Sequence, residues 1–439
     1  MNMKAKKAAF FTLGCKVNQY DTEAIQAQFR ADGYDIVDFN HDKADVYLIN
    51  TCTVTNVSDG KSRQMIRRAR RKNPEAKIVV VGCFAQTDPK QVAAIPGVNL
   101  IVGTNNRHKI VELVNNLKLE EQYSLVDDIF QVREFEEFDV FTFQGRTRAS
   151  LKIQDGCNQF CSYCKVPYAR GPSRSRTPEN VIAQVKKIAN QGYREIVLTG
   201  VHLGAYGRDL SPHSSLTSIV EAITLVEGVE RIRISSVDPN EIDDELIALV
   251  AYNPKVCRHL HIPLQSGSDE ILAKMRRRYS TKDFFNIVKH IKSLDPEIAV
   301  TTDIIVGFPG ETQELFEESY KLLRELELAK IHVFKYSPRT NTPAAKYPNQ
   351  VNSQEKVYRS HIMMELSNQM AAAFNRKFID QRVRVLLETE NQDRVFGLTD
   401  NYLHVSSALG SFVGSELIGK IMNVKIIDAD FSQAEGILI

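Results

Sequence analysis

Three closely spaced cysteines are the residues best suited to chemistry in this 439-residue chain. Cys157, Cys161 and Cys164 form a C-x3-C-x2-C run. A cubane iron–sulfur cluster has four irons, so three thiolates leave one iron without a protein ligand. An open iron can bind a small molecule and pass an electron into it, whereas a fully ligated cluster only relays electrons. The spacing therefore predicts redox chemistry on a bound molecule.

Zinc is the alternative metal for the same run. A zinc site needs a fourth cysteine or histidine at short spacing, and the next histidine, His202, is distant in the sequence. The pattern therefore favours iron and sulfide. Placed directly after the apolar stretch 149–154, the run resembles that of the radical S-adenosylmethionine (SAM) superfamily. This resemblance implies that SAM binds the open iron and is cleaved to a 5′-deoxyadenosyl radical.

A second group of cysteines, Cys15, Cys52 and Cys83, follows three strand-like runs. The runs and the helical patterns between them are residues 9–13, 18–31, 46–50, 58–72 and 78–82. This βαβαβ order predicts parallel strands, whose carboxyl ends meet at one edge of a sheet. The three thiols are therefore expected to converge on a second cluster with an open iron. Taken singly, each could be an ordinary buried cysteine.

The composition limits the class of protein. The formal net charge is only +2, so binding to nucleic acid requires local basic patches. We expect a cytoplasmic protein, because the sequence shows neither a long apolar run nor a secretory leader. Seven cysteines, an odd number, argue against a disulfide framework. Cys257 has no partner at a ligand spacing and is expected to be a structural thiol.

The middle of the chain alternates strands and helices. A helical pattern covers 178–191, and the strand candidates are 195–199, 231–235, 259–263, 300–306 and 330–334. With the strand before Cys157 they make six βα units, which predicts an incomplete TIM-like barrel or a doubly wound sheet. Ligand-binding residues then belong at the carboxyl ends of the strands.

Small and polar residues stand at those strand ends. Candidates for binding SAM are Thr199, Gly200, Ser235, Ser236, Gln265, Ile305 and Gly307, together with Tyr163 between two cysteines. Any βα unit needs such turns, which is the alternative interpretation. Residues 305–311 also resemble a radical SAM motif that flanks the adenine. Thr199 and Gly200 occupy the place of the stretch that receives the methionine amino group.

The last sixty residues change character. Short strand patterns cover 383–387, 394–397, 402–405, 421–427 and 436–439, which predicts a small closed β-barrel of the OB type. Such barrels often, though not always, bind oligonucleotides. Basic residues add to an RNA-binding hypothesis, and the candidates are Lys61, Arg67, Arg68, Arg71, Arg174 and Arg176. A charged run can equally be a solvated face.

The order of these parts resembles the methylthiotransferases over essentially the whole chain. The matching motifs are Gly14-Cys-Lys-Val-Asn18, Asn50-Thr-Cys52, Gly82-Cys83 and the C-x3-C-x2-C run. The first of these, with Pro167-Tyr-Ala-Arg-Gly171, is similar to the MtaB branch. The resemblance implies a methylthiotransferase domain at 6–118, a radical SAM domain at 143–375 and a TRAM-like barrel at 376–439. Lys165 departs from the pattern, since the family usually has an apolar residue there.

The MtaB branch implies methylthiolation of carbon 2 of N6-threonylcarbamoyladenosine beside the tRNA anticodon. It implies two [4Fe–4S] clusters, one SAM as methyl donor and one as radical source, and an electron donor such as flavodoxin or ferredoxin. The clusters and SAM would then carry the reaction, without a side-chain acid or base. Alternatives are a sister enzyme acting on isopentenyladenosine in tRNA or on a ribosomal protein, and a non-catalytic RNA-binding iron–sulfur protein.

Overall fold

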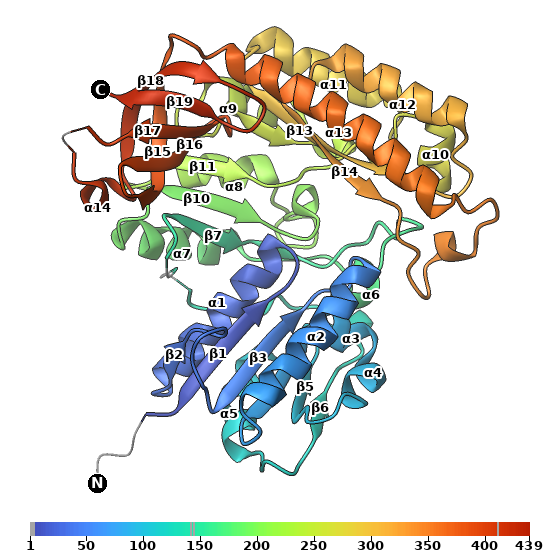
Figure 1. Ribbon diagram of the computed structural model, residues 1–439, viewed down its shortest axis with the longest axis vertical. Helices are drawn as coiled ribbons and strands as arrows, with labels where there is room; N and C mark the ends of the chain where they lie inside the picture. Colours follow the sequence, from blue (N-terminus) through green and yellow to red (C-terminus); the bar gives the residue numbers. More distant parts are fainter. Residues whose placement is uncertain (1–4, 141–142, 144, 411) are drawn as a thin grey trace. The chain divides into compact units, whose positions relative to one another are not determined.

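The computed structural model describes residues 5–140, 143, 145–410 and 412–439. Their contacts define two compact units (Figure 1). The first holds the described residues of Met1–Val140, Lys152–Arg176 and Ser337–Ala345, and the second those of Phe141–Leu151, Thr177–Tyr336 and Lys346–Ile439. The domain limits expected at 6–118, 143–375 and 376–439 stay a prediction.

A parallel sheet in the order β2-β1-β3-β4-β5-β6 organises the first unit. Its strands are β1 (Lys7–Thr12), β2 (Asp35–Val37), β3 (Val46–Thr51), β4 (Lys77–Gly82), β5 (Leu100–Val102) and β6 (Tyr123–Leu125). The predicted strands β1, β3 and β4 are neighbours, as the βαβαβ pattern requires. The strands β2, β5 and β6 were not predicted, because three-residue strands are too short to show a periodic pattern.

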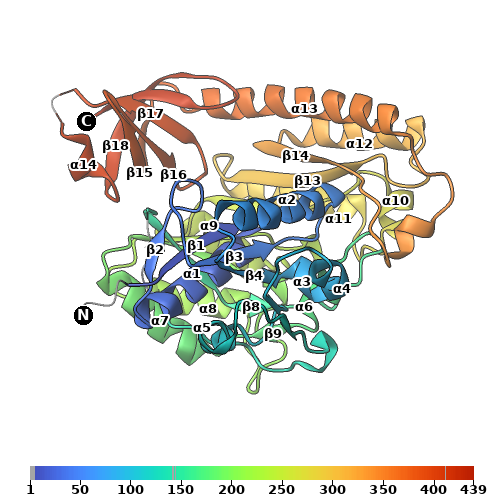
Figure 2. The same cartoon turned by 60° about the horizontal axis from the view of Figure 1, so that its bottom comes forward.

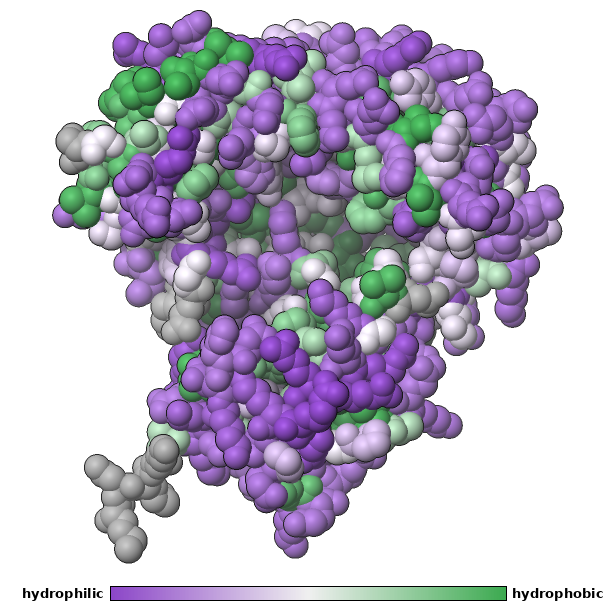
Figure 3. Space-filling view, in the orientation of Figure 1, coloured by the Kyte–Doolittle hydropathy of each residue, from purple (hydrophilic) through white to green (hydrophobic). Residues whose placement is uncertain are grey.

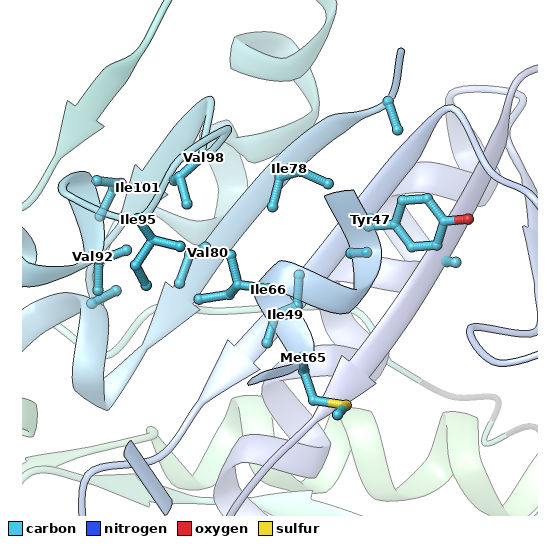
Figure 4. Close-up of a cluster of buried hydrophobic side chains, with 14 of the residues drawn as sticks. Tyr47, Ile49, Met65, Ile66, Ile78, Val80, Val92, Ile95, Val98 and Ile101 are labelled. Atoms are coloured by element: carbon cyan, nitrogen blue, oxygen red, sulfur yellow. The ribbon is translucent and has the colours of Figure 1, made fainter. Parts of the chain in front are cut away.

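Alternate residues of these strands pack on the two faces of the sheet. Tyr47 and Ile49 join Ile66 of α2 in one buried cluster, drawn in Figure 4. Leu48 joins Ile25 of α1 in the cluster on the other face. The remaining elements of this unit are α1 (Lys16–Ala31), α2 (Asn56–Lys72), α3 (Cys83–Thr87), α4 (Pro89–Ala93), α5 (Ile110–Asn116), β8 (Gln154–Asp155), α6 (Val166–Arg170) and β9 (Arg174–Ser175).

The second unit contains the predicted central βα repeats. Its strands form the sheets β11-β10-β7 and β12-β13-β14, and the pairs β10–β11, β12–β13 and β13–β14 are parallel. The strands are β7 (Arg148–Lys152), β10 (Glu195–Thr199), β11 (Arg231–Ile234), β12 (His259–His261), β13 (Ala299–Val306) and β14 (Lys330–Lys335). The helices between them are α7 (Pro178–Asn190), α8 (Leu216–Thr224), α9 (Asp244–Tyr252), α10 (Asp269–Lys274), α11 (Thr281–Leu294) and α12 (Gln313–Leu326).

A long helix leads from these repeats into the predicted barrel. Helix α13 (Ser353–Arg376) packs against β14 and runs toward the C-terminal strands, as Figure 2 shows. The barrel closes in the order β15-β16-β17-β19-β18. Its elements are β15 (Arg382–Asn391), β16 (Arg394–Thr399), β17 (His404–Ala408), α14 (Gly414–Leu417), β18 (Ile421–Ala429) and β19 (Ala434–Leu438). The expected α/β class with a terminal β-barrel is thus confirmed. Among the described residues, every helix is too short or too polar to cross a membrane.

Candidate functional site

The strand register brings Cys15, Cys52 and Cys83 to one edge of the first sheet. Thr12 pairs with Asn50, and Thr51 pairs with Gly82. The chain therefore leaves β1, β3 and β4 at the same level, and each cysteine follows within three residues. Cys52 and Cys83 are buried, whereas Cys15 is exposed. The structure thus gathers this group, which sequence spacing alone separates by many residues.

The glycine before Cys15 allows the backbone there to approach the Cys52 side chain closely. Gly14 has a φ of +100°, and a Cβ on it would lie 2.8 Å from Cβ and 2.9 Å from Sγ of Cys52. A real Cβ does not approach that closely, and a positive φ also disfavours other residues. Gly14 therefore lets the Cys15 turn lie against the Cys52 side chain.

Burial controls the ionisation of the two inner thiols, those of Cys52 and Cys83. It raises the pKa of Cys52, and it raises the pKa of Cys83 to about 12, while the nearby positive charge of Arg170 acts in the opposite direction. Such thiols keep their protons at neutral pH unless a cation replaces them. Converging soft donors of this kind fit an iron–sulfur cluster.

Cys157, Cys161 and Cys164 lie on one short loop of the same unit. The backbone N–H of Gln159 donates to Sγ of Cys157, and that of Val166 donates to Sγ of Cys164, both at 3.4 Å. Hydrogen bonds of this kind stabilise thiolate sulfur and tune a cluster. The loop therefore offers three sulfur ligands, and two of them, Cys157 and Cys164, accept a backbone hydrogen bond.

Lys165, which directly follows Cys164, does not point to solvent. It is buried, and its Nζ lies 2.6 Å from Oδ2 of Asp88. The charge next to Cys164 is therefore compensated by a carboxylate.

Most of the candidate SAM residues lie at strand ends in the second unit. Thr199 and Gly200 end β10, Ser235 and Ser236 follow β11, and Gly307 follows β13. Gln265 follows β12, and its backbone N–H donates to the carbonyl oxygen of Asp303, while the N–H of Ile305 donates back to Gln265. These residues therefore share one edge of parallel strands. Tyr163 belongs to the first unit, on the loop with Cys157.

Glu311 fixes the turn after β13. Its Oε2 accepts from the N–H of Gly307 at 2.6 Å and from Nη1 of Arg359 at 2.8 Å. Burial raises the pKa of this carboxyl, and Arg359 acts against that shift. The sequence pattern placed Glu311 in a motif but gave no sign of Arg359, which lies in helix α13.

The candidate RNA-binding residues separate into two groups. Lys61, Arg67, Arg68 and Arg71 are exposed on α2, and Figure 3 shows a strongly hydrophilic surface there. Arg174 and Arg176 are buried, and the RNA contact expected of them stays a prediction. Nη1 of Arg174 donates to the carbonyl oxygen of Pro172, and Arg176 pairs with Glu137 at 2.6 Å. Both of these contacts lie within the first unit.

Cys257 is buried in the second unit, whereas both cysteine groups belong to the first. Burial raises its pKa to about 12, with Arg233 acting in the opposite direction. This environment agrees with the structural role predicted for it.

Two family models match the sequence. Residues 151–323 match the radical SAM superfamily, and residues 7–103 match the family described as "Uncharacterized protein family UPF0004". The first match implies a [4Fe–4S] cluster and SAM. A cobalamin-bound radical SAM methyltransferase, TsrM from Kitasatospora setae, has a similar fold, with a TM-score of 0.58 and 16% identity over 78% of this chain and 77% of that one.

Curated relatives match over nearly the whole length. The "Threonylcarbamoyladenosine tRNA methylthiotransferase MtaB" of Bacillus subtilis (strain 168) is 47% identical over 98% of this chain and 95% of its own. The protein of the same name in Aquifex aeolicus (strain VF5) is 38% identical over 96% and 100%. A "tRNA-2-methylthio-N(6)-dimethylallyladenosine synthase" of Clostridium botulinum (strain Loch Maree / Type A3) is 36% identical over 97% and 95%. The chain therefore belongs to the radical SAM tRNA methylthiotransferase family, with the MtaB proteins.

Proposed function

We propose that this chain transfers a methylthio group to carbon 2 of N6-threonylcarbamoyladenosine at position 37 of tRNA. The observation that carries this proposal is the full-length similarity to proteins named for that reaction, at 47% and 38% identity. The relative named for the dimethylallyladenosine reaction is 36% identical, well below the 47% of the Bacillus subtilis protein.

The two cysteine groups would hold different clusters. Cys157, Cys161 and Cys164 would ligate the cluster that binds SAM, and Cys15, Cys52 and Cys83 would ligate an auxiliary cluster. When bound, the clusters and SAM would supply the electron, the radical, the sulfur and the methyl group. The chain's own contribution is to leave one iron open at each site and to shield the inner thiols from water. Burial of Cys52, Cys83 and Cys161 supports that second task.

Strand-end residues of the second unit would orient SAM. The proposed contacts are Thr199, Gly200, Ser235, Ser236, Gln265, Ile305 and Gly307, with Tyr163 from the cluster loop. Their common edge of parallel strands supports this assignment, because ligands of α/β folds bind at that edge. The turn at Gly307 is held by Glu311, so that its backbone keeps one conformation.

The exposed basic face of α2 is the proposed contact with the anticodon stem-loop. Lys61, Arg67, Arg68 and Arg71 would each neutralise phosphate and release counterions. The C-terminal barrel would add a second RNA contact, as OB-type barrels commonly do. The proposal also includes flavodoxin or ferredoxin as electron donor and a cytoplasmic location.

Analysis of tRNA from cells lacking the gene tests the substrate. We expect the 2-methylthio form of N6-threonylcarbamoyladenosine to disappear and the unmethylthiolated nucleoside to accumulate, as measured by mass spectrometry. The wild-type gene should restore the modification, and the Cys157→Ala variant, as matched control, should not. Loss of the methylthio group from isopentenyladenosine instead, or from a ribosomal protein, would assign the chain to a sister activity.

A reaction in vitro tests whether the chain is an enzyme or a non-catalytic RNA-binding protein. Anaerobic protein incubated with SAM and dithionite should form 5′-deoxyadenosine, and added tRNA should become methylthiolated. If the protein binds tRNA but forms no 5′-deoxyadenosine, it is an RNA-binding iron–sulfur protein rather than an enzyme.

A further inference from the structure

Asn18 joins the three N-terminal cysteine segments of the first unit. Its Nδ2 donates to the carbonyl oxygen of Leu13 at 2.7 Å and to that of Thr51 at 3.0 Å. Thr51 directly precedes Cys52, and Leu13 lies two residues before Cys15. Oδ1 of Asn18 lies 4.0 Å from Sγ of Cys83, and the side chain is fully buried. One amide group therefore contacts all three segments.

Arg170 connects this amide to the other cysteine loop. Its Nη2 donates to Oδ1 of Asn18, and its Nη1 lies 2.8 Å from Oδ2 of Asp21 and 3.2 Å from Oδ2 of Asp155. Oδ1 of Asp155 accepts from the backbone N–H of Gly156 at 2.9 Å. Gly156 directly precedes Cys157, so hydrogen bonds run without a break from the C-x3-C-x2-C loop to Asn18.

Arg170 differs from the neighbouring cations because it contacts Asn18. Lys152 and Arg107 also pair with Asp21, but the cation that donates to Asn18 is Arg170. The positive charge of Arg170 acts on both Cys52 and Cys83. Replacing a buried ion network with apolar side chains is often neutral or stabilising, so stability alone is a weak reason for this one.

We propose that Arg170 is a positioning residue for the auxiliary site, fixing Asn18 and the three N-terminal cysteine segments to the Cys157 loop and placing a permanent positive charge beside the auxiliary cluster. This inference rests on the proposed function, because it requires a cluster on Cys15, Cys52 and Cys83. A fixed positive charge favours the reduced, more negative state of a cluster and so raises its reduction potential.

The test uses the full chain carrying Cys157→Ala, Cys161→Ala and Cys164→Ala, so that only the auxiliary cluster can form. Arg170→Met in this background should shift the midpoint potential, followed by electron paramagnetic resonance, to a more negative value. Arg170→Lys keeps the charge and should restore most of that shift. Arg107→Met removes a cation from the same network without touching Asn18 and should leave the potential unchanged.

Three outcomes would overturn the inference. If the potential and spectrum of Arg170→Met equal those of the parent, Arg170 does not act on the cluster. If Arg107→Met causes the same shift, the effect is a general loss of the network. If the parent chain with the three alanines holds no iron, the auxiliary cluster itself is refuted. This result is seen before Arg170 is changed, so it is distinguishable from a failure of the Arg170 proposal. If Arg170→Met alone loses its iron while Arg107→Met keeps it, the positioning role is supported, and Arg170→Lys then tests the charge.

Discussion

Nζ of Lys165 lies 2.6 Å from Oδ2 of Asp88, and both side chains are largely shielded from solvent. Lys165 follows Cys164 directly, and Asp88 immediately precedes α4. The pair therefore brings a cation next to a proposed cluster ligand without adding net charge there. Its carboxylate partner explains how the structure accommodates a buried lysine at this position.

We expect Asp88→Asn to raise the reduction potential of the cluster on Cys157, Cys161 and Cys164. The change leaves the Lys165 charge uncompensated, and net positive charge favours the reduced cluster. Losing one partner of a buried pair should also cost about 3–5 kcal/mol of stability. Redox titration and thermal unfolding would measure the two effects.

Lys165→Met combined with Asp88→Asn is the matched control. The double variant removes both charges and should return the potential close to that of the wild type. A potential that stays raised in the double variant would show that the amide at position 88, rather than the uncompensated charge, is responsible.

Gly14→Ala should prevent assembly of the auxiliary cluster. The new Cβ would lie within 3 Å of the Cys52 side chain, at a φ that alanine rarely adopts. We expect iron content to fall by about four per chain. Gly60→Ala is the control, because a Cβ there would meet no other group of the described residues within 4 Å, and alanine favours the helix. Equal iron loss in both variants would contradict the steric argument.

Substitution of single cysteines should divide them into three classes. The wild-type protein should hold about eight irons per chain. Alanine at 15, 52 or 83 should remove about four but leave SAM cleavage, whereas alanine at 157, 161 or 164 should remove a similar number and abolish 5′-deoxyadenosine formation. Cys257→Ala should retain both clusters. A wild-type content of about four irons would eliminate the auxiliary site.

Local patterns predicted the strands that precede the cysteines, because apolar runs of four residues are visible in the sequence, and a glycine directly precedes two of the cysteines. They also predicted the terminal barrel. The pairing of Arg170 with Asn18 was not predictable from spacing, since side chains 152 residues apart meet only in the tertiary structure. The same limit applies to Arg174 and Arg176, because their burial depends on tertiary contacts that the sequence pattern does not show.

Arg233 should anchor the barrel within the second unit. Its Nη1 and Nη2 donate to the carbonyl oxygens of Asp400 and Thr399, and its Nε lies 2.7 Å from the fully buried carboxylate of Glu195. Arg233→Met should therefore cost about 3–5 kcal/mol and increase hydrogen exchange in the segment 399–403. Arg194→Met, which removes an exposed partner of Glu230, should cost less than about 1 kcal/mol. Similar losses in the two variants would contradict an anchoring role.

The cost of Arg233→Met should also depend on pH. In the wild type, burial raises the pKa of Glu195, but Arg233 and Arg231 outweigh it and hold the pKa below its usual value of 4.5. The resulting stabilisation is complete above that value and is lost only as the pH falls through the lower, folded-state pKa. Wild-type stability should therefore not depend on Glu195 between about pH 5.5 and 8.5.

Without Arg233, burial dominates, and the pKa of Glu195 should rise above its unfolded value. The folded variant then binds a proton that the unfolded chain has released, so its stability falls as the pH rises through the raised pKa. Thermal unfolding should show a smaller cost of Arg233→Met at pH 5.5 than at pH 8.5. Adding Glu195→Gln should remove this difference, because an amide does not titrate. An equal cost at both pH values would mean that Arg231, 3.6 Å from Glu195, and the charge of Arg148 keep the carboxylate ionised without Arg233.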